Sequence, residues 1–242
     1  MVSFDNTITF MKPRNAWKML VVFLLLVPAQ SRALGFSFQS VNLMAGGTLP
    51  RAEYGGLYYN SQQIQPKVLP ALGAAAEFLV HEQWFMQLVF QPGLAYAGYK
   101  FRIHDSAASL QYAYPAAYDF SYAGVQALVK IKFNFGSLRP YVFGGPQFDY
   151  LVAATLTVTP NNYFLGHTAA LVPGELDLKD KKIIRKTRWM IDAGAGLEWE
   201  LATPVALLVD LRYQRSFDKI NDSSSDIRMD ALQAMTGLRI GI

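Results

Sequence analysis

The chain has 242 residues, of which 52% are hydrophobic and 17% charged, and its formal net charge is +4. This length is enough for one domain with a sizeable core. Because cysteine is absent, the sequence excludes a disulfide framework, a thiolate metal site and a lipid-modified N-terminal cysteine.

The N-terminal segment has the pattern of a secretory signal peptide. Three basic residues precede the apolar run Met19–Ala29, and the small-residue exit Ser31-Arg32-Ala33 follows it. The run is too short for a membrane-spanning helix, and a buried helix is the alternative interpretation. We predict residues 1–33 as a cleaved signal peptide and 34–242 as the exported domain. Cleavage leaves 18 of the 22 basic and 17 of the 18 acidic residues, so no charge excess for nucleic-acid binding remains.

Beyond this segment, apolar and polar side chains alternate with a period of two, which is the period of a β-strand. The predicted strands are Phe36–Thr48, Lys67–Val80, Trp84–Phe101, Phe120–Phe135, Pro140–Val158, Arg188–Leu201, Val205–Phe217 and Arg228–Ile242. Their connections alternate between long loops and short turns. An even strand number with this alternation is typical of outer-membrane barrels. The sequence therefore predicts an all-β fold, an eight-stranded antiparallel up-and-down transmembrane β-barrel.

Two of the early strands are irregular. In the first strand, Phe36 and Phe38 are out of step with Val41 and Leu43, so the identity of the outward face is ambiguous. In the third strand, Pro92 cannot donate a hydrogen bond to a neighbouring strand, and we predict a β-bulge at this position.

The fourth predicted strand has the clearest alternation in the chain. One face carries Ala123, Val125, Ala127, Val129, Ile131, Phe133 and Phe135, and the other carries Tyr122, Gly124, Gln126, Leu128, Lys130, Lys132 and Asn134. If the first face meets lipid, a charge at Val129 should be poorly tolerated. Gln126→Arg should be tolerated better, because the opposite phase of the barrel holds carboxylates.

The hairpin formed by the sixth and seventh strands indicates which face meets lipid. Its apolar set is bracketed by Trp189 and Trp199, and about ten residues on a strand tilted by about 40° span roughly 25 Å, the height of the apolar band of a membrane barrel. Its polar set contains Gly194 and Gly196, which leave room inside a narrow barrel. We predict that the apolar face meets lipid and the charged face lines the lumen, whereas a soluble barrel would have the reverse arrangement. The predicted aromatic girdle comprises Trp84, Trp189, Trp199 and Tyr213.

The charged side chains that are predicted to point into the lumen are the set of residues that says most about function. They are Glu77, Lys130, Lys132, Asp149, Asp192, Glu198, Asp210, Arg212 and Arg239. Charges removed from water must be paired, and side chains largely fill the interior of an eight-stranded barrel. We interpret the set as a structural network of ion pairs, and a gated pore is the alternative.

A group of basic residues near the end of the longest loop indicates a lipid partner. The group comprises Lys179, Lys181, Lys182, Arg185, Lys186 and Arg188. Cations gain by pairing with the phosphates of surface lipopolysaccharide. We predict a lipopolysaccharide contact at this group, and a solvated charged loop is the alternative.

No segment has the pattern of a cofactor or metal site. The histidines His81, His104 and His167 are not spaced for a metal, no Gly-x-Ser-x-Gly elbow occurs, and Gly194-Ala195-Gly196 lies within a predicted strand. His104-Asp105-Ser106 could supply the Ser and His of a lipid-modifying barrel enzyme, but a polar loop tip is the favoured interpretation. We predict that the protein is not an enzyme and has no cofactor or metal.

Several segments resemble the PorT-like outer-membrane β-barrel family. They are Gly73–Phe78, Gln87–Tyr96, Arg139–Pro146, Asp192–Glu198 and Asp210–Tyr213. The resemblance covers most of the exported domain and implies an outer-membrane barrel. Few members of that family have a known role, and one is implicated in a secretion system for surface proteins. The segment Gly237–Ile242 resembles the signal read by the barrel-assembly machinery, although Ile242 replaces the usual terminal aromatic residue and Met235 replaces a polar one.

These patterns predict a non-enzymatic barrel in the outer membrane of a Gram-negative bacterium. Its surface loops would bind or protect, or the barrel would serve a secretion or envelope complex. The alternative is a narrow, porin-like channel for small solutes, and a lipid-modifying enzyme is a third hypothesis. The expected partners are outer-membrane lipid, lipopolysaccharide, the barrel-assembly machinery and an unidentified envelope protein, and no nucleic acid.

Overall fold

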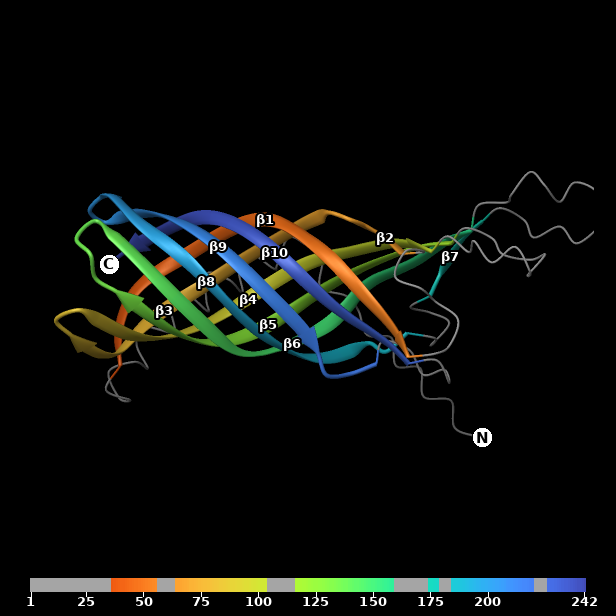
Figure 1. The fold of residues 1–242 in the computed structure, drawn as a ribbon, viewed down its shortest axis with the longest axis horizontal. Coiled ribbons are helices and arrows are strands. Elements are labelled where there is room, and N and C mark those ends of the chain that lie inside the picture. Colours follow the sequence, from red (N-terminus) through yellow and green to blue (C-terminus); the bar gives the residue numbers. More distant parts are fainter. Residues whose placement is uncertain (1–35, 56–63, 104–115, 159–173, 179–183, 220–225) are drawn as a thin grey trace, which may run out of the picture.

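The computed structural model describes residues 36–55, 64–103, 116–158, 174–178, 184–219 and 226–242, and almost all of them lie in β-strands (Figure 1). The strands are β1 (Ser37–Gly55), β2 (Ile64–Lys67), β3 (Leu69–Gln83), β4 (Met86–Ile103), β5 (Ala116–Phe133), β6 (Leu138–Val158), β7 (Gly174–Asp177), β8 (Thr187–Ala202), β9 (Val205–Ser216) and β10 (Asp226–Gly241). In these ranges no helix is long and apolar enough to cross a membrane.

The eight long strands close into one antiparallel barrel. Each pairs with the next in the order β1, β3, β4, β5, β6, β8, β9 and β10, and β10 pairs with β1 to complete the circle. The short strands β2 and β7 are extensions that pair with β4 and β6. The predicted eight-stranded up-and-down barrel is therefore confirmed. Closure pairs every long strand on both sides, which removes the exposed edge that an open sheet would have.

The two ends of the barrel differ in their connections. At one end, short turns join β3 to β4, β5 to β6 and β8 to β9, and the C-terminus lies at the same end (Figure 1). The short strands β2 and β7 lie at the other end. We name these the turn end and the loop end.

Several strands extend farther toward the loop end than the alternation of side chains predicts. β1 continues to Gly55 because it stays paired with β10 as far as Asp226. β5 already begins at Ala116, which pairs with neighbours on both sides. β7 lies in a segment that was predicted as loop alone. Where a strand extends beyond the membrane into water, its outer face need not be apolar. The alternation of apolar and polar residues is then lost, although the strands remain hydrogen-bonded to each other.

A β-bulge in β1 explains the ambiguous phase of the first predicted strand. Phe38 pairs with Phe78 of β3, whereas Ser40 pairs with Glu77, so the register shifts between these two pairs. The extra residue lets side chains that are out of step in the sequence, such as Phe38 and Leu43, lie on the same outward face.

The bulge predicted at Pro92 is wrong. Pro92 pairs with Ala127 of β5 within an unbroken register, and the register between β3 and β4 is the same on both sides of it. A proline lacks one ladder hydrogen bond, but its φ angle suits a strand, so no extra residue is required. The register shift of this hairpin occurs instead between Leu79 and His81, where β3 continues to Gln83.

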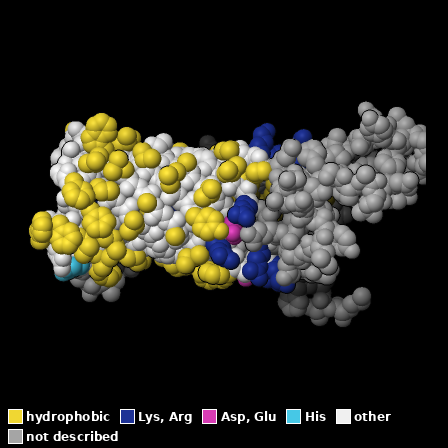
Figure 2. Space-filling model, viewed as in Figure 1, with side chains coloured by type: hydrophobic (Ala, Val, Ile, Leu, Met, Phe, Trp, Pro, Cys, Tyr) yellow, Lys and Arg dark blue, Asp and Glu magenta, His cyan; other side chains and the backbone are white. Residues whose placement is uncertain are grey.

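The two faces of the wall separate apolar from polar side chains as the alternation predicts. In β5, Val125 and Val129 are about half exposed (53% and 49%), whereas Gln126 and Leu128 are buried. The same two-residue period of exposure runs through β8 and β9. Apolar side chains are spread over the described wall in Figure 2, and the Lys and Arg side chains lie at one end of it. The predicted girdle residues are all exposed on the outside, namely Trp84, Trp189, Trp199 and Tyr213.

Two glycines flank Met44 of β1, and the space around them differs. Met44 pairs with Gly237 across the β1–β10 seam and with Gly73 of β3. A Cβ atom at Gly237 would overlap the carbonyl oxygen of Leu43, whereas a Cβ atom at Gly73 would have its nearest neighbour at 3.6 Å. We expect Gly237→Ala to lower the free energy of unfolding by about 1–3 kcal/mol, and the matched variant Gly73→Ala to leave it nearly unchanged. Urea unfolding in lipid vesicles measures both, and equal stabilities would contradict the close approach at the seam.

The interior of the barrel has two parts. Toward the loop end it is an apolar and aromatic core that includes Tyr99, Phe101, Phe120, Tyr122, Leu151, Ala154, Met229 and Ala231. Toward the turn end, charged and amide side chains fill the space between the strands. Most of the buried charges therefore lie toward the turn end, and one buried pair, Arg188 with Asp149, lies among the aromatic side chains nearer the loop end.

Candidate functional site

Four charged side chains form a closed ring across the lumen near the turn end. They come from every second strand around the barrel: Glu77 from β3, Lys132 from β5, Glu198 from β8 and Arg239 from β10. Because four strand steps separate β3 from β8 in an eight-stranded barrel, the two carboxylates stand on opposite sides of the lumen. Each of the two cations bridges both of them.

Short distances close this ring. Lys132 Nζ lies 2.6 Å from Oε2 of Glu77 and 2.8 Å from Oε2 of Glu198. On the other side, Arg239 Nε lies 3.3 Å from Oε2 of Glu77, and Arg239 Nη1 lies 3.4 Å from Oε1 of Glu198. Opposite walls of the barrel are thus joined through side chains in direct contact. At this level, four ion-pair contacts cross the lumen.

Glu77 is the centre of the hydrogen bonding around the ring. Besides the two ring cations, Lys130 Nζ and Asn42 Nδ2 each donate to its Oε1 at 2.9 Å, and Ser40 Oγ donates to its Oε2 at 2.9 Å. Five side chains therefore donate to one fully buried carboxylate. In a site without bulk water, each of these donors depends on the negative charge of Glu77.

A vestibule at the turn end reaches the ring at Arg239. It has a volume of about 430 Å³, and its wall includes Arg139, Glu200, Pro204 and Arg239. Arg139 joins the wall to the ring, because its Nη2 lies 2.9 Å from Oε2 of Glu200 and its Nη1 lies 3.3 Å from Oε1 of Glu198. The vestibule therefore borders one member of the ring, Arg239, and also Arg139, which is paired with Glu198 of the ring.

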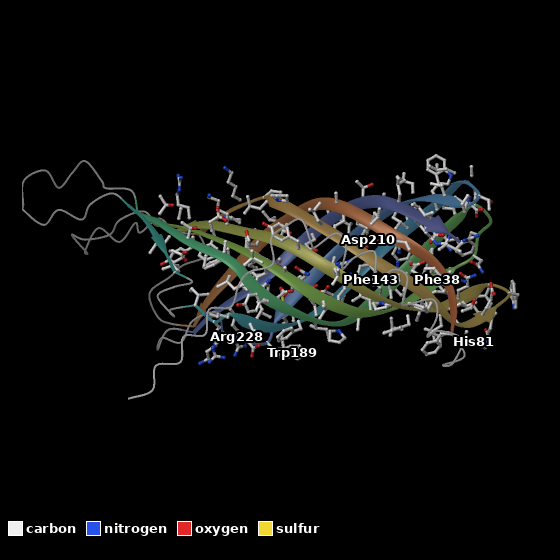
Figure 3. The ribbon with its side chains drawn as sticks, turned by 180° about the vertical axis from the view of Figure 1, so that it is seen from behind. Phe38, His81, Phe143, Trp189, Asp210 and Arg228 are labelled. Carbon is white, nitrogen blue, oxygen red and sulfur yellow. The ribbon has the colours of Figure 1, made fainter. Side chains whose placement is uncertain are left out.

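A second level of charges lies above the ring, in the middle of the barrel. Arg212 Nη1 lies 3.3 Å from Oδ2 of Asp192 and donates to Oε1 of Gln126 at 2.7 Å. The hydroxyl of Tyr141 donates to Asp210. Figure 3 shows Asp210 and Phe143 within the barrel wall, and Trp189 on its outside. The rings of Phe143 and Tyr141 occupy the room left by the inward-phase glycines Gly194 and Gly196.

A third level, nearer the loop end, is built around Arg188. Its Nη2 and Nε donate to Oδ2 of Asp149 at 2.7 and 3.0 Å. The guanidinium carbon lies 4.3 Å from the ring centre of Tyr99 and 3.8 Å from that of Tyr122. An arginine held between two aromatic faces and paired with a carboxylate is stabilised both by cation–π attraction and by its ion pair.

The structure places all nine of the charged residues assigned to the lumen inside the barrel. It groups Glu77, Lys130, Lys132, Glu198 and Arg239 at the first level, Asp192, Asp210 and Arg212 at the second, and Asp149 at the third. Each of them lies within 4 Å of an opposite charge.

The lipopolysaccharide contact predicted for Arg188 is wrong, because its guanidinium is buried and paired with Asp149 inside the barrel. Arg188 and Met190 are two residues apart in β8, so their side chains point to the same side of the strand, into the barrel. The position of Arg188 in the strand therefore determines where its side chain points, although its neighbours in the sequence are basic. Arg185 and Lys186 are exposed. Outside the described residues lie Lys179, Lys181, Lys182, His104, His167 and the predicted signal peptide, residues 1–33.

Sequence reasoning did not identify the aromatic and amide partners of the charges. Tyr99 and Tyr122 lie on inward phases, but nothing in the sequence links them to Arg188, which is three strands away from Tyr99 and two from Tyr122. The reason given for tolerance of Gln126→Arg does not match the structure, because Gln126 accepts a hydrogen bond from Arg212, and the tolerance itself stays a prediction. An arginine at that position would bring two guanidinium groups together rather than meet a free carboxylate.

The residues that the structure describes hold no group of three or more His, Asp and Glu side chains arranged to bind a metal ion.

The sequence of this barrel matches the model of a known family. Residues 31–222 match the family described as "Outer membrane protein beta-barrel domain". This chain belongs to that family. The family places the protein among the β-barrels of the bacterial outer membrane.

Solved structures of small outer-membrane barrels are also similar to this member of the family. Ail, the attachment invasion locus protein of Yersinia pestis, is 15% identical, with a TM-score of 0.39, over 84% of this chain and 99% of Ail. Neisserial surface protein A is 12% identical, with a TM-score of 0.42, over 84% and 97%. The outer membrane protease OmpT from Escherichia coli is 7% identical, with a TM-score of 0.46, over 86% and 98%. No curated protein matches the chain. Structural similarity with such low sequence identity and TM-score assigns no ligand or activity to this protein.

Proposed function

We propose that this protein is a non-conducting, non-enzymatic barrel that anchors its loop end at the surface of the bacterial outer membrane. The observation that carries the proposal is the ring of Glu77, Lys132, Glu198 and Arg239, which joins opposite walls of the lumen. A pore needs side chains that line the wall and leave the centre to water. In this barrel the side chains meet at the centre.

The proposed orientation follows from the connections. Outer-membrane barrels have short turns on the periplasmic side and longer loops on the outside. The turn end, with its vestibule and the C-terminus, would therefore face the periplasm. The loop end would be free to bind or protect, or to serve an envelope complex, as the PorT-like resemblance implies. The C-terminal segment Gly237–Ile242 would be read by the barrel-assembly machinery during insertion.

The space above the ring also supports a closed lumen rather than a narrow channel. The cavity that lies between Asn42, Gln91, Gln126 and Arg212 has a volume of about 10 Å³. This is room for about one water molecule. Farther toward the loop end the apolar core fills the interior. An ion that entered from either end would have to displace paired charges without compensating contacts.

A planar-bilayer experiment tests the proposal. We expect the wild-type protein, inserted in folded form, to produce no reproducible single-channel steps, because the ring joins opposite walls. Folding of the inserted sample is checked by heat-modifiable migration on gels, and a general porin serves as the positive control. Reproducible conductance steps from the wild-type protein would overturn the non-conducting assignment and favour the channel for small solutes.

A further inference from the structure

Basic side chains gather on the outside of the barrel at its loop end. Figure 2 shows Lys and Arg side chains beside the apolar wall, at the border of the part that is not described. On neighbouring strands at this end lie Lys67 of β2 and Lys100 and Arg102 of β4. The pairing of β2 with β4 sets Lys67 directly opposite Lys100.

All three side chains of this group point away from the lumen. In β4, Tyr99 and Phe101 are buried in the core, so the alternate residues Lys100 and Arg102 face outward. Residues that are directly opposite in an antiparallel pair share a face, so Lys67 faces outward with Lys100. We name Lys67, Lys100 and Arg102 the outer basic cluster.

The charges of the outer basic cluster are only partly balanced. Lys100 Nζ lies 2.7 Å from Oδ2 of Asp119 on β5, and both side chains are about one-third exposed. Lys67 and Arg102 make no ion pair with another described residue. Two like charges directly opposite each other on one face destabilise a sheet unless an anion lies between them. The cluster therefore has an excess of two positive charges and a geometry that favours an added anion.

The height of the outer basic cluster above the apolar band indicates which kind of anion it would meet. On β4, the outward residues below it are Leu94 and Tyr96, and on β3 they include Leu72, all of them exposed apolar side chains of the band. The four residues from Tyr96 to Lys100 rise roughly 10 Å along a tilted strand. With Tyr96 at the edge of the hydrocarbon, this rise places the cluster at the outer side of the headgroup region, which is about 5–8 Å thick on each side of a bilayer.

We propose that the outer basic cluster binds the phosphate groups of a phosphorylated lipid in the outer leaflet. Arg102 can bind a phosphate with two parallel hydrogen bonds, and lysine binds it as a point charge. This inference rests on the proposed orientation, in which the loop end faces outward. It moves the expected lipopolysaccharide contact from the loop around residue 180 to the barrel wall itself.

The test compares two double variants with the same change of charge. The first double variant, Lys67→Gln with Arg102→Gln, removes the two positive charges of the outer basic cluster that make no ion pair with a described residue. Lys186→Gln with Arg215→Gln removes two other exposed cations that make no ion pair with a described residue. Each folded protein, in detergent, is titrated with diphosphoryl lipid A and with the same lipid lacking its phosphates, and bound lipid is measured by native mass spectrometry.

We expect the wild-type protein to prefer the phosphorylated lipid. Removing two cations from a site on an anionic surface should weaken its binding by about 30-fold, whereas the matched double variant should bind within about threefold of wild type. Binding of the dephosphorylated lipid should be the same in all three proteins. Heat-modifiable migration on gels confirms that each variant is folded.

Equal affinities of the two double variants would overturn the proposal. Displacement of the lipid by an equimolar amount of inorganic phosphate would also overturn it, because the cluster would then be a general anion site. Neither result bears on conductance, so a failure here is distinguishable from a failure of the non-conducting assignment.

Discussion

Replacing Glu77 by glutamine is expected to lower the free energy of unfolding by about 3–5 kcal/mol, the cost of removing one partner from a buried ion pair. Glu77→Gln keeps the size of the side chain but removes the charge that accepts from Lys130, Lys132 and Arg239. Lys130 would then lose the ion pair that it makes with Glu77, and Lys132 and Arg239 would keep only Glu198. Unfolding by urea in lipid vesicles, followed by tryptophan fluorescence, measures the change.

The matched control is Glu82→Gln in the same strand. Glu82 is exposed near the turn end and accepts a hydrogen bond from Gln87. Water replaces an exposed partner at little cost, so this variant should be nearly as stable as wild type. If Glu77→Gln were as stable as Glu82→Gln, the ring would not hold opposite walls of the barrel together.

Arginine on the apolar face should cost about 2–4 kcal/mol at the midplane of the bilayer. Both Val129 on β5 and Ala195 on β8 lie on this face, Ala195 in the middle of its strand and Val129 nearer the turn end of its strand. We expect Val129→Arg and Ala195→Arg each to fold less completely into lipid vesicles, because a guanidinium would enter the hydrocarbon without a partner. Folding yield and urea unfolding report the effect.

The controls for the apolar face are Val129→Leu and Ala195→Leu. Lipid chains adapt to a larger apolar side chain, whereas a packed protein interior does not. Both leucine variants should therefore fold as wild type does. Loss of stability in the leucine variants would indicate that this face packs against protein, and stable arginine variants would indicate that it meets water.

The barrel itself could be predicted from the sequence because a membrane wall imposes a simple pattern. Along β5, β8 and β9 every second side chain is apolar, and the structure places those side chains outside. The inward phase likewise identified the buried charges, including Glu77 and Arg239. These results depend only on the direction in which each side chain leaves its strand, which the period of two determines.

The partners of these charges could not be predicted in the same way. Which inward residues meet depends on the stagger of the strands around the barrel, and no single strand encodes it. Lys132 and Glu198 are far apart in sequence and on strands that are not neighbours, yet they are in contact. For Arg188, the basic segment suggested a surface contact, although its phase in β8 placed it inside.

Local features that break the period were also missed. The bulge between Phe38 and Ser40 shifts the phase without any glycine or proline to mark it. Pro92, the visible irregularity, leaves the register unchanged. Propensity rules describe which residues tolerate a lost hydrogen bond, whereas the position of a bulge depends on how the closing strands fit together.

Cysteine labelling of two adjacent residues tests most directly whether the outer face meets lipid while the ring closes the lumen. The natural chain has no cysteine, so Leu128→Cys and Val129→Cys each introduce a single thiol. Leu128 is 1% exposed inside the barrel and Val129 is 49% exposed on its outside, at nearly the same height. In vesicles, a small charged thiol reagent present on both sides should label neither variant, and it should label both after unfolding. Labelling of folded Leu128→Cys would show a water-filled lumen, and labelling of folded Val129→Cys would show that the outer face meets water.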